Sequence, residues 1–61
     1  MTPAARLARQ IGYHFKHYRG NIERARDPDV PPAKREAAWS RAANHRATIE
    51  RRLHQLAGEP A

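Results

Sequence analysis

Cationic side chains without neighbouring acids are the first candidates for chemistry in this chain. The first 22 of the 61 residues contain no Asp or Glu, although they include Arg6, Arg9, Lys16 and Arg19. Guanidinium groups can donate two parallel hydrogen bonds to a phosphate or a carboxylate. The whole chain has a formal net charge of +6 and a calculated pI of about 11.2. These features predict an anionic partner, which we expect to be nucleic acid, an acidic protein surface or a charged membrane.

A helical projection of residues 3–26 gathers cationic and aromatic side chains on the side opposite Leu7, Ile11 and Ile22. Arg and Lys can contact phosphates there, and a tyrosine can donate its hydroxyl group or stack on an unpaired base. The alternative is an ordinary solvated helix face, with a compositional bias toward Arg and Ala as the source of its charge. We call the predicted nucleic-acid-binding residues the basic face: Arg6, Arg9, Tyr13, Lys16, His17 and Arg24.

Histidine spacing raises the question of a metal. His14 and His17 lie three residues apart, which places both on one side of a helix. A tetrahedral site needs three or four converging ligands, however, and the chain has no cysteine and no acidic residue before Glu23. We therefore expect no metal and no cofactor. The four histidines predict instead that positive charge increases below about pH 6.5.

Catalysis is not expected. Ser40 is the only serine, the chain has no cysteine, and it contains no glycine-rich phosphate loop. Two helices also leave little space for a substrate pocket. The sequence therefore favours a binding protein over an enzyme.

Capping residues and prolines divide the chain into two helices. Thr2 and Pro3 form a typical helix start, and the prolines at 28, 31 and 32 disfavour helix in the residues before them. We predict a single domain with a helix over about 3–26, a Pro-rich turn over 27–31, a helix over about 32–57 and a short tail over 58–61. A break at Gly20 is the alternative, but Ile22 and Ala25 continue the apolar spacing beyond it.

Each predicted helix carries apolar residues at intervals of three or four, which is typical of one buried stripe. The short turn predicts an all-α, antiparallel two-helix hairpin. Because one hairpin cannot cover both stripes, we expect it to dimerise into a four-helix bundle. Arg46 interrupts the second stripe, and we expect its alkyl stem to lie over the core with its charge in water. The predicted core and dimer residues are Leu7, Ile11, Phe15, Tyr18, Ile22, Trp39, Ile49, Leu53 and Leu56.

Three classes of function fit these elements. The first is a nucleic-acid-binding homodimer, and the second is a small regulator or inhibitor that docks on an acidic or grooved partner protein. An interfacial membrane binder is the third class. We expect no membrane insertion, because the mean hydropathy is −0.99 and no run of about 18 apolar residues occurs. The Arg-rich start resembles a mitochondrial presequence, but its pattern continues into the predicted fold, which favours a cytoplasmic protein.

Overall fold

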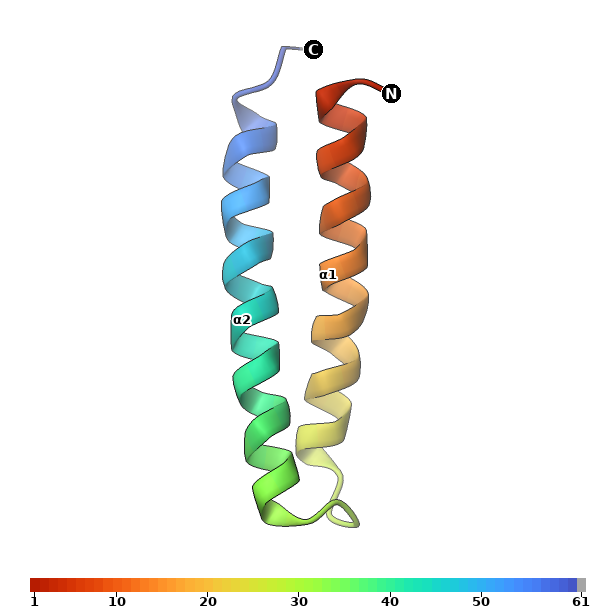
Figure 1. The fold of residues 1–61 in the computed structure, drawn as a ribbon, viewed down its shortest axis with the longest axis vertical. Coiled ribbons are helices and arrows are strands. Elements are labelled where there is room, and N and C mark those ends of the chain that lie inside the picture. The colour runs from red at the N-terminus through yellow and green to blue at the C-terminus, as the bar shows by residue number, and fades with distance from the viewer. Residues whose placement is uncertain (61) are drawn as a thin grey trace.

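The computed structural model describes residues 1–60, which form two helices, α1 (Pro3–Arg26) and α2 (Pro32–Ala57). The helices run antiparallel side by side, so both ends of the chain lie at one end of the molecule and the turn lies at the other (Figure 1). The molecule measures 45 × 16 × 11 Å. The predicted all-α helical hairpin is confirmed. Ala61, the last residue of the predicted tail, lies outside the described residues.

Helix α1 is fixed at its start by a side-chain cap and continues without a break. The Thr2 hydroxyl accepts a hydrogen bond of 3.1 Å from the backbone N–H of Ala5, which satisfies one of the free donors at the helix start. Pro3 occupies the first helical position, where it has no N–H to leave unpaired. The helix runs through Gly20 in ordinary helical geometry.

The turn is stiffened by proline and by one aspartate. Asp27 is extended, as expected for a residue that precedes Pro28. Its carboxylate accepts a hydrogen bond of 2.9 Å from the N–H of Asp29, and its carbonyl accepts one of 3.1 Å from Val30. Pro32 then opens α2. A connection this short holds the two helices antiparallel.

The helices meet along positions that recur every three or four residues, as in an antiparallel coiled coil. Every one of these positions is buried or half-buried. Only Ala25, Ala38 and Ala42 are fully buried among residues 1–60, so no large side chain is completely covered. The contact line consists of Ala4, Leu7, Ile11, His14, Tyr18, Asn21 and Ala25 on α1, and of Arg35, Ala38, Ala42, His45, Ile49, Arg52 and Leu56 on α2.

On α2 this contact line differs from the expected stripe. Trp39 and Leu53 lie beside it and are 47% and 49% exposed, and Phe15 on α1 is 50% exposed. Small alanines occupy the inward positions and let the helices approach, so the larger side chains lie to the side. Arg46 also lies beside the contact line, with most of its side chain exposed rather than over the core, and its Nε donates a hydrogen bond of 3.2 Å to Oε1 of Glu50.

Candidate nucleic-acid interface

The contact line separates two sides of the hairpin that differ in chemistry. On one side lie the residues that come one position after a contact residue, as Phe15 comes after His14 and Trp39 after Ala38. On the other side lie the residues that come one position before a contact residue, as His17 comes before Tyr18 and Arg41 before Ala42. We call the first side the apolar face, and it carries Phe15, Ile22, Trp39 and Leu53. We call the second side the polar face, and it carries Gln10, His17, Arg24, Lys34, Arg41, Thr48 and Gln55.

Three histidines, His14, His17 and His45, form a cluster in the middle of the polar face. The Nδ1 atoms of His14 and His45 are 2.8 Å apart, which is a hydrogen bond in which one ring donates and the other accepts. The His17 ring stacks against His45 with a centroid separation of 5.5 Å and an interplanar angle of 20°. Tyr13 extends this surface, because its ring centroid is 4.4 Å from that of His17 and 5.2 Å from that of His14.

The electrostatics of the cluster favour a neutral His45. Burial lowers the pKa of His45, and the positive charges of His14 and His17 lower it further. The hydrogen bond to His14 also needs one unprotonated nitrogen. Within residues 1–60 the structure contains no group of three or more His, Cys, Asp or Glu side chains that could hold a metal ion.

Helix α2 contributes cationic groups to the same side of the hairpin. The Nε of Arg41 donates a hydrogen bond of 3.0 Å to Oδ1 of Asn21 on α1. Near the two chain ends, Arg52 lines a groove together with Arg6. The sequence alone does not determine that this side of α2 adjoins the basic face. The register of the two helices decides it, as the hydrogen bond between Arg41 and Asn21 shows.

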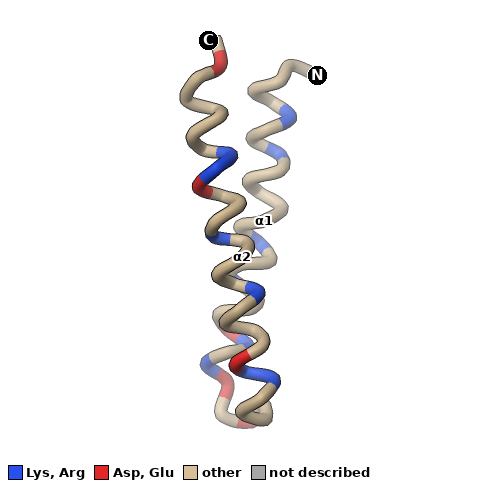
Figure 2. Tube along the Cα trace, turned by 60° about the vertical axis from the view of Figure 1, so that its left-hand side comes forward, with Lys and Arg blue, Asp and Glu red and all other residues tan. Residues whose placement is uncertain are grey.

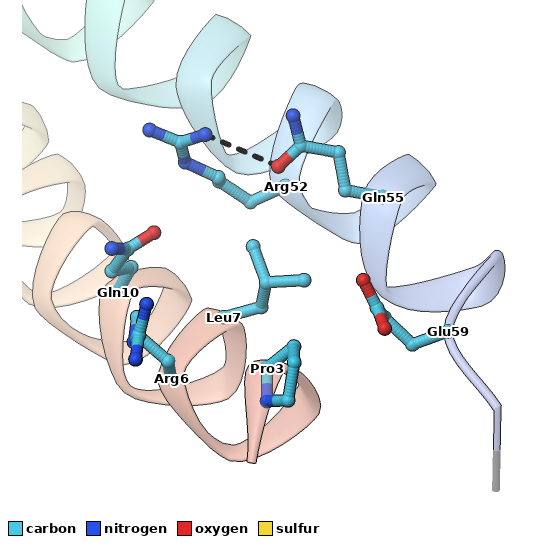
Figure 3. Close-up of a pocket in the computed structure, with 7 residues that line it drawn as sticks. All are labelled: Pro3, Arg6, Leu7, Gln10, Arg52, Gln55 and Glu59. Atoms are coloured by element: carbon cyan, nitrogen blue, oxygen red, sulfur yellow. Dashed lines mark hydrogen bonds between the residues drawn. The ribbon is translucent and has the colours of Figure 1, made fainter. Parts of the chain in front are cut away.

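A groove near the chain ends, which we call the open-end groove, lies between the two helices. It is open to water and has a volume of about 460 Å³. Arg52 extends from α2 toward α1, and its Nη1 donates a hydrogen bond of 3.1 Å to Oε1 of Gln55 (Figure 3). The Nε of Arg52 is buried and has no hydrogen-bond partner among the described residues. The residues that line the groove are Pro3, Arg6, Leu7, Gln10, Arg52, Gln55 and Glu59.

All six predicted nucleic-acid-binding residues are exposed on α1. The structure brings Tyr13 and His17 together and places Arg6 in the open-end groove. Arg9 and Lys16 lie on the outward side of α1, away from α2. Sequence reasoning did not bring His14 and His45 into this site, because their contact joins residues 31 apart.

The predicted core and dimer residues fall into two groups. Leu7, Ile11, Tyr18, Ile22, Ile49 and Leu56 are half-buried at or beside the contact line. Phe15, Trp39 and Leu53 are exposed on the apolar face. A narrow groove of about 130 Å³ also lies on this face, between Tyr18, Ile22 and Trp39.

Charge varies along the long axis as well as across it. The half of α1 near the chain ends carries Arg6 and Arg9 and no acidic residue (Figure 2). The turn end carries Glu23, Asp27, Asp29 and Glu36 among its own Lys and Arg residues. Basic residues on α1 are therefore without acidic neighbours near the chain ends and mixed with them near the turn.

Comparisons with protein-family models, with curated proteins and with solved structures found no match to this chain. Neither described helix is long and apolar enough to cross a membrane. A functional assignment therefore has to come from the side chains themselves.

Proposed function

We propose that this protein is a homodimeric helical hairpin that binds nucleic acid through the basic face of α1. The observation that carries this proposal is the separation of side chains by chemistry. Cationic and aromatic side chains gather on and beside the polar face, whereas Phe15, Trp39 and Leu53 are exposed on the apolar face. A protein of this kind has one surface to offer to an anion and another to offer to a second copy.

The thin core supports the dimer. A hairpin in which three alanines are the only buried residues among positions 1–60 gains little hydrophobic stabilisation alone. An exposed row of large apolar side chains is typical of an interaction surface. A second copy related by a twofold axis would cover both apolar faces at once and leave both polar faces in water. The result would be a four-helix bundle with two basic surfaces.

The spread of positive charge supports nucleic acid as the anion. From Arg6 to Arg24 the basic face extends over about 27 Å, at about 1.5 Å per residue. A nucleic-acid backbone presents phosphates at regular intervals over such a length. The rings of Tyr13 and His17 also offer a surface on which an unpaired base can stack.

A protein partner in place of the second copy is the other candidate. The observation in its favour is the groove beside Trp39, which a single apolar side chain of another protein would fit. The two candidates predict different masses in solution.

Two measurements test the proposal. Sedimentation equilibrium at tens of micromolar should give twice the chain mass of 7.0 kDa, and a stable, folded monomer would exclude the homodimer. Titration against single-stranded RNA, single-stranded DNA, duplex DNA and anionic vesicles at two salt concentrations should show salt-dependent, saturable binding to a nucleic acid. Binding to vesicles alone, or to none of these, would exclude nucleic acid as the partner.

A further inference from the structure

The open-end groove is lined by two arginines from different helices. Arg6 lines it from α1 beside Gln10, and Arg52 lines it from α2 beside Gln55 (Figure 3). Two guanidinium groups that line one groove are a typical arrangement for binding a tetrahedral oxyanion, because each can donate to a different oxygen.

Neither arginine is neutralised by an ion pair with another described residue. The salt bridge found within residues 1–60 joins Arg46 to Glu50, on the apolar side of α2. Arg52 donates instead to the neutral amide of Gln55, and its Nε–H has no acceptor. Leaving a buried donor without an acceptor is costly, so Arg52 gains from any arrangement that provides one. An oxyanion in the groove would provide acceptors for the guanidinium N–H groups of Arg52.

Glu59 is the acidic residue that lines the groove. With one carboxylate and two guanidinium groups, the lining keeps a net positive charge. The carboxylate repels an incoming anion and competes with it for the arginines. Removing this carboxylate should therefore strengthen anion binding, whereas removing either arginine should weaken it.

We infer that the open-end groove is a phosphate subsite in which Arg6 and Arg52 together hold one phosphodiester of a nucleic-acid strand. This inference rests on the proposed function and adds a specific site to it, contributed by both helices. The groove is open to water along its length, so a strand can pass through it with its sugars beside Gln10 and Gln55. The groove also adjoins the half of α1 that has no acidic residue (Figure 2).

Neighbouring arginines on α2 provide a matched test. Arg52→Gln and Arg51→Gln remove the same charge from adjacent positions, but Arg51 is exposed and donates to Thr48 on its own helix. With an end-labelled, mixed-sequence single-stranded RNA as the probe, Arg52→Gln should weaken binding about tenfold more than Arg51→Gln. It should also reduce the slope of log affinity against log salt by about 1. The combined Arg6→Gln and Arg52→Gln variant should lose less than the sum of the two single losses, because both side chains serve one phosphate.

The acidic residues provide a second test that does not depend on Arg52. Glu59→Gln should strengthen binding severalfold, whereas Glu36→Gln, the same change at the turn end, should have a smaller effect. Helicity and mass of each variant are measured alongside. If Arg52→Gln fails to fold, the comparison of Glu59→Gln with Glu36→Gln still tests whether the open-end groove binds phosphate.

The outcomes separate this inference from the proposed function. Equal effects of Arg52→Gln and Arg51→Gln, together with equal effects of Glu59→Gln and Glu36→Gln, would overturn the phosphate subsite while the protein still binds nucleic acid. Absence of binding by the unmodified protein would overturn the proposed function itself. Competition by poly-glutamate that equals competition by an unlabelled oligonucleotide would contradict a site for phosphate.

Discussion

Single residues in the interface differ in how their charge responds to pH. A guanidinium group keeps its charge throughout the physiological range, whereas burial and the nearby charges of His14 and His17 hold the pKa of His45 below its ordinary value. The cluster consists of residues that the sequence separates, since His14 and His45 are 31 positions apart. Their contact could not be predicted without the register, which the turn alone fixes only to within a residue or two. His17 and Tyr13 could be chosen from the sequence because they share one side of a single helix.

We expect the free energy of unfolding to decrease as the pH falls below about 6.5. The folded protein holds the pKa of His45 below its ordinary value of 6.5, so the unfolded chain binds that proton more readily. The contribution of a neutral His45 to stability is therefore fully present above this pH and decreases as the pH falls below it. Urea unfolding at a series of pH values should show this decrease, and His45→Gln should reduce it. His54→Gln, a change outside the cluster, should leave the pH dependence as it was, and an unchanged dependence in His45→Gln would contradict this role.

Tyr13→Ala tests whether the exposed ring of Tyr13 stacks on unpaired bases. Stacking on an unpaired base is worth about 1 to 3 kcal/mol, whereas a paired base is not available to the ring. Fluorescence titrations should therefore show a larger loss of affinity for single-stranded RNA or DNA than for duplex. Equal losses on all three probes would indicate that Tyr13 contacts the backbone only.

At the level of the helices, local signals and tertiary packing contribute different information. The Thr2 cap, the prolines at 28, 31 and 32 and the three-four spacing suffice to predict two helices joined antiparallel. They do not determine which side of α2 faces α1, because α2 has two neighbouring rows of apolar residues and either could pack against α1. One row contains Ala38, Ala42 and Ile49, and the other contains Trp39 and Leu53. Packing selects the row with alanines because small side chains allow the helix axes to come closer.

Gly20→Ala should stabilise the protein by about 0.5 to 1 kcal/mol, since glycine has the lower helix propensity. A Cβ at this position would meet no atom within 4 Å. Urea unfolding measures the gain. Gly58→Ala, outside the helix, is the control and should change stability less. A destabilised Gly20→Ala variant would indicate that another molecule covers this part of α1.

For the whole molecule, the division into an apolar and a polar face is the property from which its behaviour follows. The division arises because the two helices meet slightly to one side of their apolar rows, so part of each row stays in water. A second copy would cover this surface without interfering with the basic face. Assembly and nucleic-acid binding should therefore respond to different substitutions.

Trp39→Ala should weaken the dimer by about 2 to 4 kcal/mol, the usual cost of removing a large apolar side chain from a core. In an isolated hairpin the same change should cost much less, because Trp39 is 47% exposed there. Sedimentation at several concentrations should show dissociation at a higher concentration than for the unmodified protein. Tyr13→Ala removes an aromatic side chain from the other side and should leave the dimer intact. Equal effects of the two changes would place the subunit contact elsewhere.

The salt dependence of binding tests the central claim most directly. Arg9 and Lys16 are exposed on the outward side of α1, so replacing both with Gln should leave helicity and assembly unchanged. If each contacts a phosphate, the slope of log affinity against log salt should become shallower by about 2, because fewer counterions are released. Saturable binding by the unmodified protein at about 50 mM salt, with this change of slope in the double variant, is the result that we predict. Absence of saturable binding to any nucleic acid at that salt, or an unchanged slope, would contradict it.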